Sequence, residues 1–446
     1  MQHATATTMK ARKPYHPRSA PWWNANCTEA VATLRAASTA EDRKTYSAQL
    51  RAAARKAKWK WADEVIGKSK LWEVATWRHG RRMNKVPPLR AEEGLVHTHA
   101  DSDVSKILSN RFFVETPPEV PVRLEDDPPP RATRELPTFS KDMIADLLTD
   151  TSNLSSPGAS GQTWRLIKWA WASTPEILTD LITGCIRAGH HPLIWRQAIV
   201  CAVPKPHRAD YSLVKNFRPV SFLECMGKLV EKLMARLLYS EIIRHDLLPT
   251  NQYGGRMASS TLDAGLTLTH DIQVAHMAGL RTGLLLFDIQ GYFDNINRER
   301  LVQVVADLGF APEIVSWTRA FLSDRTVRLK FNNSTSDPFS SGVGTPQGSP
   351  ISPVLSTLYT HALLRMTRDI KWTSLNLYID DGAILACGKT WAEVESSLTA
   401  AYTSCASWLN RSGLKAEPDK TELIYFRRRH EKVDPPGHIF LSQYSH

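Results

Sequence analysis

Three aspartates stand where strand-like segments end. Four apolar residues, Leu284 to Phe287, run directly into Asp288, a pattern that predicts a buried strand delivering a carboxylate to its exposed end. Asp380 and Asp381 lie between two apolar runs, which predicts a β-hairpin with both acids at the turn. Adjacent carboxylates repel each other, so solvent or a divalent cation has to relieve them. Each segment taken alone also fits an ordinary strand end or surface turn.

A loop rich in small residues lies between these two segments. It covers residues 344–353, contains Gln347 between Pro346 and Gly348, and leads into a helix-like run from Val354. Small residues let a backbone approach a ligand closely, and a glycine-rich loop before a helix either cradles an anion or is only a turn. The order of the three segments therefore carries more information than any one of them.

Taken in this order, the segments resemble the reverse transcriptase domain, and more closely that of the non-LTR (LINE-like) retrotransposons of fungi, over roughly residues 155–426. The resemblance implies an α+β fold with the fingers and palm of a right-hand polymerase. An antiparallel palm sheet, a preceding basic helical region and a largely absent thumb belong to this expectation. It also implies an RNA-directed DNA polymerase, a nucleotidyltransferase that adds dNTPs to a primer 3′-hydroxyl on an RNA template. RNA template, DNA primer and dNTPs are then the expected partners, and the sequence does not fix the oligomeric state.

The resemblance also assigns roles to single residues. Asp288, Asp380 and Asp381 are expected to bind two Mg²⁺ ions, or Mn²⁺ in their place, because magnesium prefers hard oxygen ligands. Lys420 is expected to protonate the departing pyrophosphate, with a plain surface lysine as the alternative. The expected nucleotide-binding residues are Arg218, Lys205, Phe293, Gln347 and Ile289.

Most of the nucleotide-binding residues have a specific expected task. Arg218 would clamp the triphosphate, because a guanidinium fork matches phosphate oxygens, and Lys205 would assist it. Phe293 resembles the aromatic gate that collides with a ribose 2′-hydroxyl and so selects deoxynucleotides; its alternative is an ordinary core aromatic. Gln347 resembles the glutamine that lies against the nucleotide and the template.

The remainder of the chain divides by composition. Residues 1–90 hold 19 Lys and Arg against 6 Asp and Glu, whereas the whole chain has a net charge of +11. A basic surface attracts nucleic acid through counterion release, although many basic helices are only solvated faces. The predicted division is a basic helical region over 1–114, a Pro-rich acidic linker over 115–137, the fingers and palm over 138–426 and a truncated tail over 427–446.

Local patterns predict several helices and one loop. The stretch 20–82 is rich in Ala, Lys, Arg and Trp and predicts long helix. A helix over 140–148 begins with a serine cap, and a second amphipathic stretch begins at Trp164. The loop 156–161 resembles the template-side loop of the family, with Ser160 where many relatives have Asp, which leaves its polar contact open.

The six cysteines form no Cys-x-x-Cys pair, which argues against a zinc module or a disulfide framework. No stretch approaches the roughly 20 apolar residues of a membrane span. A soluble, intracellular protein without a membrane partner is therefore expected, and target-primed synthesis would place it in the nucleus. Two alternatives stay open: a catalytically inactive, truncated element remnant that only binds nucleic acid, and an RNA-dependent RNA polymerase with the same palm geometry.

Overall fold

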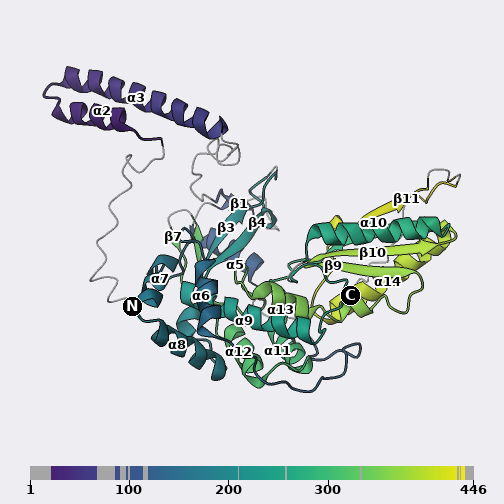
Figure 1. The fold of residues 1–446 in the computed structure, drawn as a ribbon. Coiled ribbons are helices and arrows are strands. Elements are labelled where there is room, and N and C mark those ends of the chain that lie inside the picture. Colours follow the sequence, from purple (N-terminus) through teal and green to yellow (C-terminus); the bar gives the residue numbers. More distant parts are fainter. Residues whose placement is uncertain are drawn as a thin grey trace. The chain divides into compact units, whose positions relative to one another are not determined.

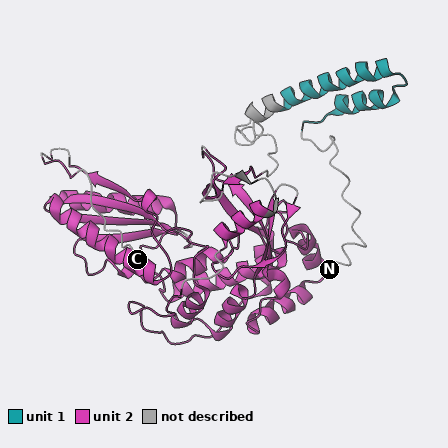
Figure 2. Ribbon diagram, turned by 180° about the vertical axis from the view of Figure 1, so that it is seen from behind, with its two compact units in different colours: residues 1–85 teal, residues 86–446 magenta. Residues whose placement is uncertain are grey.

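The computed structural model describes residues 22–67, 86–90, 97–98, 101–113, 119–208, 210–256, 259–331, 334–428, 431 and 433–436. The chain divides into two compact units, Met1–Lys85 and Val86–His446 (Figure 2). The part of the predicted helix beyond residue 67 and most of the tail 427–446 lie outside the described residues. None of the described helices combines the length and apolar character that a membrane span requires.

The first unit contains two helices rather than one. They are α2 (Ala25–Ala36) and α3 (Ala40–Gly67), which pack against each other. The helix ends at Ala37, whose backbone is extended, with ψ at 123°. It restarts because Thr39 and Asp42 cap the new helix: the Thr39 hydroxyl accepts from the Asp42 amide and donates to its carboxylate. The predicted continuous helix is therefore broken by a local cap.

Two main sheets organise the second unit, in the mixed α+β architecture that the sequence predicts (Figure 1). The four-stranded sheet is antiparallel, in the order β11-β5-β10-β9. Its strands are β5 (Arg281–Asp288), β9 (Thr373–Tyr378), β10 (Asp381–Gly388) and β11 (Glu422–Phe426). The five-stranded sheet includes the parallel pair β3 and β6. Its strands are β3 (Gln197–Pro204), β4 (Phe217–Phe222), β6 (Thr326–Phe331), β7 (Ser334–Thr335) and β8 (Phe339–Ser340). A separate two-stranded ribbon is formed by β1 (Leu89–Arg90) and β2 (His97–Thr98).

Helices surround these sheets. They are α5 (Asp101–Phe112), α6 (Lys141–Thr149), α7 (Trp164–Ser173), α8 (Pro175–Arg187), α9 (Cys225–Arg244), α10 (Thr261–Met277), α11 (Arg298–Asp307), α12 (Pro312–Leu322), α13 (Ser352–Tyr359) and α14 (Trp391–Arg411). The serine cap predicted for α6 is confirmed, since the Ser140 side chain accepts from the Met143 amide. The predicted start at Trp164 is confirmed as the first residue of α7.

Two apolar clusters form the core of the second unit. The larger cluster joins Leu285 and Phe287 of β5 to the buried faces of α9, α11, α13 and α14. The smaller one joins Leu108 of α5 to Val200 of β3 and Leu329 of β6. The helix α5 is thus part of the second unit, and the predicted boundary at residue 114 falls inside that unit.

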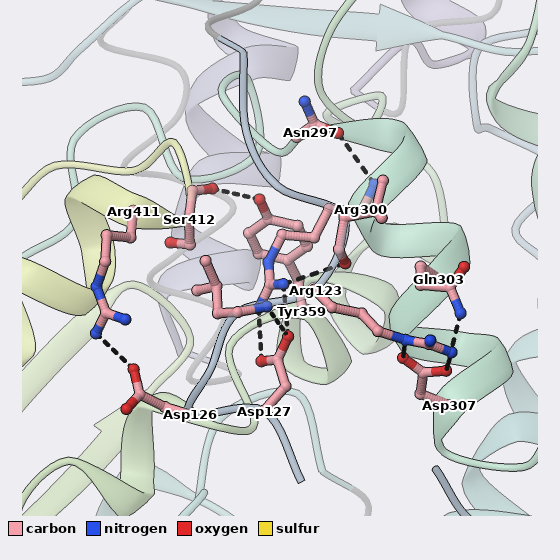
Figure 3. A network of polar contacts seen from close by, with 12 residues as sticks. Arg123, Asp126, Asp127, Asn297, Arg300, Gln303, Asp307, Tyr359, Arg411 and Ser412 are labelled. Atoms are coloured by element: carbon pink, nitrogen blue, oxygen red, sulfur yellow. Dashed lines mark hydrogen bonds and ion pairs between the residues drawn. The ribbon is translucent and has the colours of Figure 1, made fainter. Parts of the chain in front are cut away.

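The Pro-rich acidic segment packs onto the second unit through ion pairs (Figure 3). The Asp127 carboxylate accepts two hydrogen bonds, at 2.7 and 2.8 Å, from Arg300 of α11, whose side chain is fully buried. Two further ion pairs join Arg123 to Asp307 of α11 and Asp126 to Arg411 of α14. The segment whose composition predicted a linker is therefore anchored at both helices.

Candidate active site

The ends of two strands bring two acids together, with a third acid in the adjoining turn. The sheet register pairs Asp381, the first residue of β10, directly with Asp288, the last residue of β5. Directly paired residues carry their side chains on the same face of an antiparallel sheet. Asp380 lies in the turn before β10, and its main-chain oxygen accepts a hydrogen bond from the Ile289 amide at 3.0 Å. Residues far apart in the sequence therefore meet at one end of the four-stranded sheet.

The turn between β9 and β10 holds an unfavourable backbone conformation. Ile379 has a φ of 60°, which a β-branched residue rarely adopts. Neighbouring backbone supports it, because the Tyr253 amide donates to the Leu377 oxygen at 2.8 Å. A Cβ atom added to Gly254 would lie only 2.4 Å from the Ile379 nitrogen, so glycine is needed there. Strain of this kind gathers at functional sites, where the surroundings maintain it.

Lys420 stands directly at one of the acids. Its Nζ lies 2.6 Å from the Asp288 carboxylate. The main chain explains the approach: the Gln290 amide donates to the Lys415 oxygen and the Glu417 amide donates to the Asp288 oxygen, both at 2.8 Å. These bonds hold the segment before β11 against the end of β5, so the lysine arrives beside the carboxylate.

Burial and mutual repulsion disfavour the charged acids. Burial, Asp381 and Asp288 raise the pKa of Asp380, and Lys420 opposes the shift. Burial and Asp288 likewise raise the pKa of Asp381. The acids therefore demand more positive charge than Lys420 supplies. Within the described part of the chain, no three His, Cys, Asp or Glu side chains are gathered in a set that could hold a metal ion as they stand.

Cations from the five-stranded sheet lie near these acids. Arg218 lies in β4 and is exposed, while Lys205 directly follows β3. Burial lowers the pKa of Lys205, and so do the positive charges around it, which belong to Lys420, Arg218, Arg208 and Arg111. Lys420 also contacts Asp288, so the cations around Lys205 and the carboxylates lie close enough to influence each other's charge. A cluster of cations of this kind attracts anions.

Phe293 is partly buried and fixed by the glycine-rich loop. Its ring meets the Tyr292 ring edge-on at 5.4 Å between centroids. Its main-chain oxygen accepts from the Thr345 amide at 2.7 Å. Gly344, with a φ of 76°, permits this approach, because an added Cβ would lie 2.6 Å from the Phe293 oxygen. The loop and the segment after β5 are therefore locked together.

Gln347 lies in that loop and has two anchors. Its side-chain Nε2 donates to both carboxylate oxygens of Asp294, at 2.8 and 2.9 Å. Its main-chain oxygen accepts from the Ser221 amide of β4 at 2.8 Å. The loop thus connects the segment after β5 with the five-stranded sheet.

The loop 156–161 is anchored on a carboxylate of the chain itself. The Ser160 amide donates to Glu224 at 2.7 Å, and the Ser160 hydroxyl contacts the other oxygen of that carboxylate. Gly158 allows the close approach, since an added Cβ would lie 2.7 Å from the Glu224 nitrogen. The polar contact that the sequence left open is therefore internal.

The structure gathers the predicted residues into adjoining groups. Asp288, Ile289, Asp380, Asp381 and Lys420 lie at one end of the four-stranded sheet, Lys205 and Arg218 on the five-stranded sheet, and Phe293 and Gln347 in the two segments that are locked together. Sequence reasoning missed Asp294 and Arg111. Asp294 carried no sequence signal, because its partner Gln347 lies 53 positions further along the chain. Nothing in the sequence tied Arg111, near the end of α5, to this site.

Comparison with known proteins places the chain in a family. The model of the family described as reverse transcriptase (RNA-dependent DNA polymerase) matches residues 203–440, more than half of the chain. The chain is 30% identical over 248 residues to a probable RNA-directed DNA polymerase from transposon BS of Drosophila melanogaster, covering 55% of this chain and 27% of that protein.

Two other relatives extend further along the chain. It is 25% identical over 369 residues to a putative 115 kDa protein in the type-1 retrotransposable element R1DM of Drosophila melanogaster, covering 82% of this chain and 34% of that protein. It is 25% identical over 370 residues to an uncharacterized 149 kDa protein of transposon TX1 of Xenopus laevis, covering 78% of this chain and 28% of that protein. The chain thus spans about a third or less of the length of these relatives. It belongs to the reverse transcriptase family, with the domain found in non-LTR retrotransposons.

Proposed function

We propose that this chain is an RNA-directed DNA polymerase of a retrotransposon, which adds dNTPs to a primer 3′-hydroxyl on an RNA template. The observation that carries the proposal is the direct pairing of Asp381 with Asp288, next to Asp380, at one end of an antiparallel sheet. The four-stranded sheet is then the palm, and the five-stranded sheet with its helices forms the fingers. The expected fungal type stays a prediction, because the matched relatives come from insects and a frog.

Asp288, Asp380 and Asp381 are the residues that would hold two Mg²⁺ ions, or Mn²⁺ in their place. The fit rests on donor chemistry, because carboxylates are hard oxygen ligands and the raised pKa values of Asp380 and Asp381 express a demand for positive charge. When bound, such ions supply a Lewis acid for the primer hydroxyl and neutralise charge on the leaving pyrophosphate.

The remaining residues bind and orient the nucleotide in this proposal. Arg218 and Lys205 hold the triphosphate from the fingers side. Phe293 excludes a ribose 2′-hydroxyl, and Gln347 and Ile289 contact the nucleotide. Lys420, with 54% of its side chain exposed, gives a proton to the pyrophosphate.

The proposed partners are the RNA template, a DNA primer and dNTPs, and target-primed synthesis would take place in the nucleus. The proposed organisation keeps a basic helical region before the fingers and palm, with its boundary after Lys85 instead of residue 114. The exposed cations of the first unit, such as Arg51 and Arg55, suit a polyanionic partner.

Incorporation of dTTP on a poly(A)/oligo(dT) substrate tests the proposal. The purified chain should incorporate dTTP in the presence of Mg²⁺. Asp288→Asn and Asp380→Asn should each lower the rate by more than about 100-fold, since even outer residues of metal sites cost about 10- to 100-fold when changed. Asp369→Asn, at an exposed position outside the proposed site, is the matched control and should keep the activity. Intact RNA binding without any incorporation would instead favour the inactive, nucleic-acid-binding remnant.

A further inference from the structure

Asp294 is a partly buried carboxylate for which the proposed chemistry has no task. Both of its oxygens accept hydrogen bonds from Nε2 of Gln347, at 2.8 and 2.9 Å. Burial raises the pKa of Asp294 to about 6, while Gln347, Arg111 and Lys205 oppose the shift. Removing a carboxylate from water costs free energy unless hydrogen bonds replace those to water. The hydrogen bonds from Gln347 offset this cost for Asp294.

This pairing fixes the direction of the Gln347 amide. An ionised carboxylate only accepts hydrogen bonds, so the NH₂ group has to face Asp294 and Oε1 has to face away from it. The main chain is held independently, through the hydrogen bond from the Ser221 amide. The described residues supply no hydrogen-bond partner for Oε1, which leaves it as an acceptor for a ligand.

We propose that Asp294 is a positioning residue that holds the Gln347 amide with Oε1 presented to the incoming nucleotide, and so sets nucleotide affinity rather than the rate of the chemical step. The inference rests on the proposed polymerase function, in which Gln347 contacts the nucleotide. Without Asp294 the Gln347 side chain rotates freely and has to be ordered when the nucleotide binds, which weakens binding. The matching group on the nucleotide is a hydrogen-bond donor on its base or sugar.

Direct nucleotide binding tests this role without relying on turnover. The full chain is assembled on an RNA template with a primer that ends in a dideoxynucleotide, and dTTP is titrated with Mg²⁺ present. Asp294→Ala, which removes both acceptors of the Gln347 amide, should raise the dissociation constant about 5- to 10-fold, the cost of ordering one released side chain. The rate at saturating dTTP on an extendable primer should stay unchanged. An unchanged dissociation constant would overturn the positioning role.

A double-mutant cycle separates this role from a general structural one. If Asp294 acts through Gln347, Asp294→Ala should have no further effect on the dissociation constant in a Gln347→Ala background. Independent, multiplying effects of the two changes would contradict the inference. Urea unfolding of each variant shows whether the fold is kept. If the Asp294 variant does not fold, Asp294→Glu takes its place. This variant keeps the charge and should retain partial affinity for dTTP.

The pH dependence of the dTTP dissociation constant is a second measurement, which a purely structural role of Asp294 would not affect. Above a pH of about 6 the carboxylate is ionised and holds the amide; below it the charge is lost. The dTTP dissociation constant of the wild type should therefore rise, relative to that of Asp294→Asn, as the pH falls through 6. The charged groups that face Asp294 are Arg111 of α5 and Lys205 after β3. Arg298 of α11 and Arg325 before β6 line a small cavity together with Asp294. All four are cations that stay protonated as the pH falls, so they do not produce this profile.

The outcomes distinguish this inference from the function on which it rests. If dTTP binding depends on Asp294 but no dTTP is incorporated, the polymerase proposal is contradicted and the positioning role is still supported. If the chain incorporates dTTP but the dTTP dissociation constant does not depend on Asp294, only the positioning role is contradicted. Absence of dTTP binding by the wild type would overturn both.

Discussion

At the scale of single residues, the site is shaped by carboxylates that resist being charged together. Asp380 and Asp381 have raised pKa values because burial and neighbouring acids disfavour their ionised forms. The strained Ile379 turn nevertheless keeps them beside Asp288. An arrangement that costs stability in the isolated chain points to a ligand that relieves it, as expected for a site built for cations.

The stability of the fold should therefore respond to charge at Asp380. Its raised pKa means that its contribution to stability is complete while the carboxyl is neutral and is lost as the pH rises through the folded-state pKa. Asp380→Asn should thus raise the melting temperature at neutral pH without divalent ions, by about 2 °C for a change of order 1 kcal/mol. In thermal scans, Mg²⁺ should stabilise the wild type and not this variant. Equal stabilisation of both by Mg²⁺ would argue against Asp380 as a ligand.

Sugar selection should depend on Phe293. Its ring packs edge-on against Tyr292 and its main-chain oxygen accepts from the Thr345 amide, so the residue cannot easily move aside for a 2′-hydroxyl. Phe293→Val should raise the use of ribonucleotides relative to deoxynucleotides by at least about 10-fold, measured as the ratio of kcat/KM values. Phe293→Tyr, which keeps the ring, should leave that ratio nearly unchanged. If the valine variant keeps the same selectivity, Phe293 is only a core aromatic. One argument against an RNA-dependent RNA polymerase would then be lost.

The sequence was informative where chemistry and chain pattern coincide. Apolar runs ending in Asp288 and flanking Asp380 predicted strand ends, and the register places those ends side by side. Asp294 escaped because its partner, Gln347, lies 53 positions further along the chain. Arg111 escaped for the same reason, since its nearness to Lys205 exists only after α5 packs on the five-stranded sheet.

At the scale of elements, the sequence predicted local structure better than it predicted how the elements pack. The serine cap of α6 and the start of α7 follow from nearby residues alone, and both were predicted. The described part of the Pro-rich acidic segment, residues 119–137, has no helix or strand, as its prolines require. Its composition nevertheless gave no sign that Asp127 reaches the buried Arg300, because that contact spans 173 positions. The caps that divide the first unit into α2 and α3 were present in the sequence but were outweighed by helix propensity.

Loss of Asp127 should destabilise the second unit strongly. Arg300 is fully buried and lies over the Tyr359 ring, at 5.6 Å from its centroid (Figure 3). It also lies over the Trp408 ring, at 5.8 Å from that centroid. Asp127→Ala leaves that guanidinium without its carboxylate, which typically costs about 3–5 kcal/mol. The free energy of unfolding in urea gives the measurement. Arg123→Ala removes an ion pair whose arginine is 55% exposed and should cost far less. Equal losses in the two variants would mean that the segment is not anchored through Arg300.

At the scale of the whole molecule, charge is divided between the two units. The excess of Lys and Arg lies within residues 1–90, so the remainder of the chain is close to neutral. In α3 no acid occurs between Asp42 and Asp63. Lys44, Arg51 and Arg55 are exposed and follow one another at intervals of seven and four residues, which places them on one helix face. A stripe of this kind suits a phosphate backbone better than a protein surface of mixed charge.

This stripe should account for part of the salt dependence of RNA binding. Each phosphate contact that is lost reduces the slope of log K against log salt by about 0.7 for a single strand, so replacing Lys44, Arg51 and Arg55 with Gln should reduce it by about 2. Glutamine keeps the helix propensity of the replaced residues, so a changed slope reports charge rather than unfolding. Fluorescence titrations of a short single-stranded RNA between low and moderate salt provide the slopes. The matched control carries Arg187→Gln, Arg236→Gln and Lys371→Gln, three exposed cations of the second unit. If that control shows the same reduction, the attraction comes from the overall charge and α3 has no special part in it.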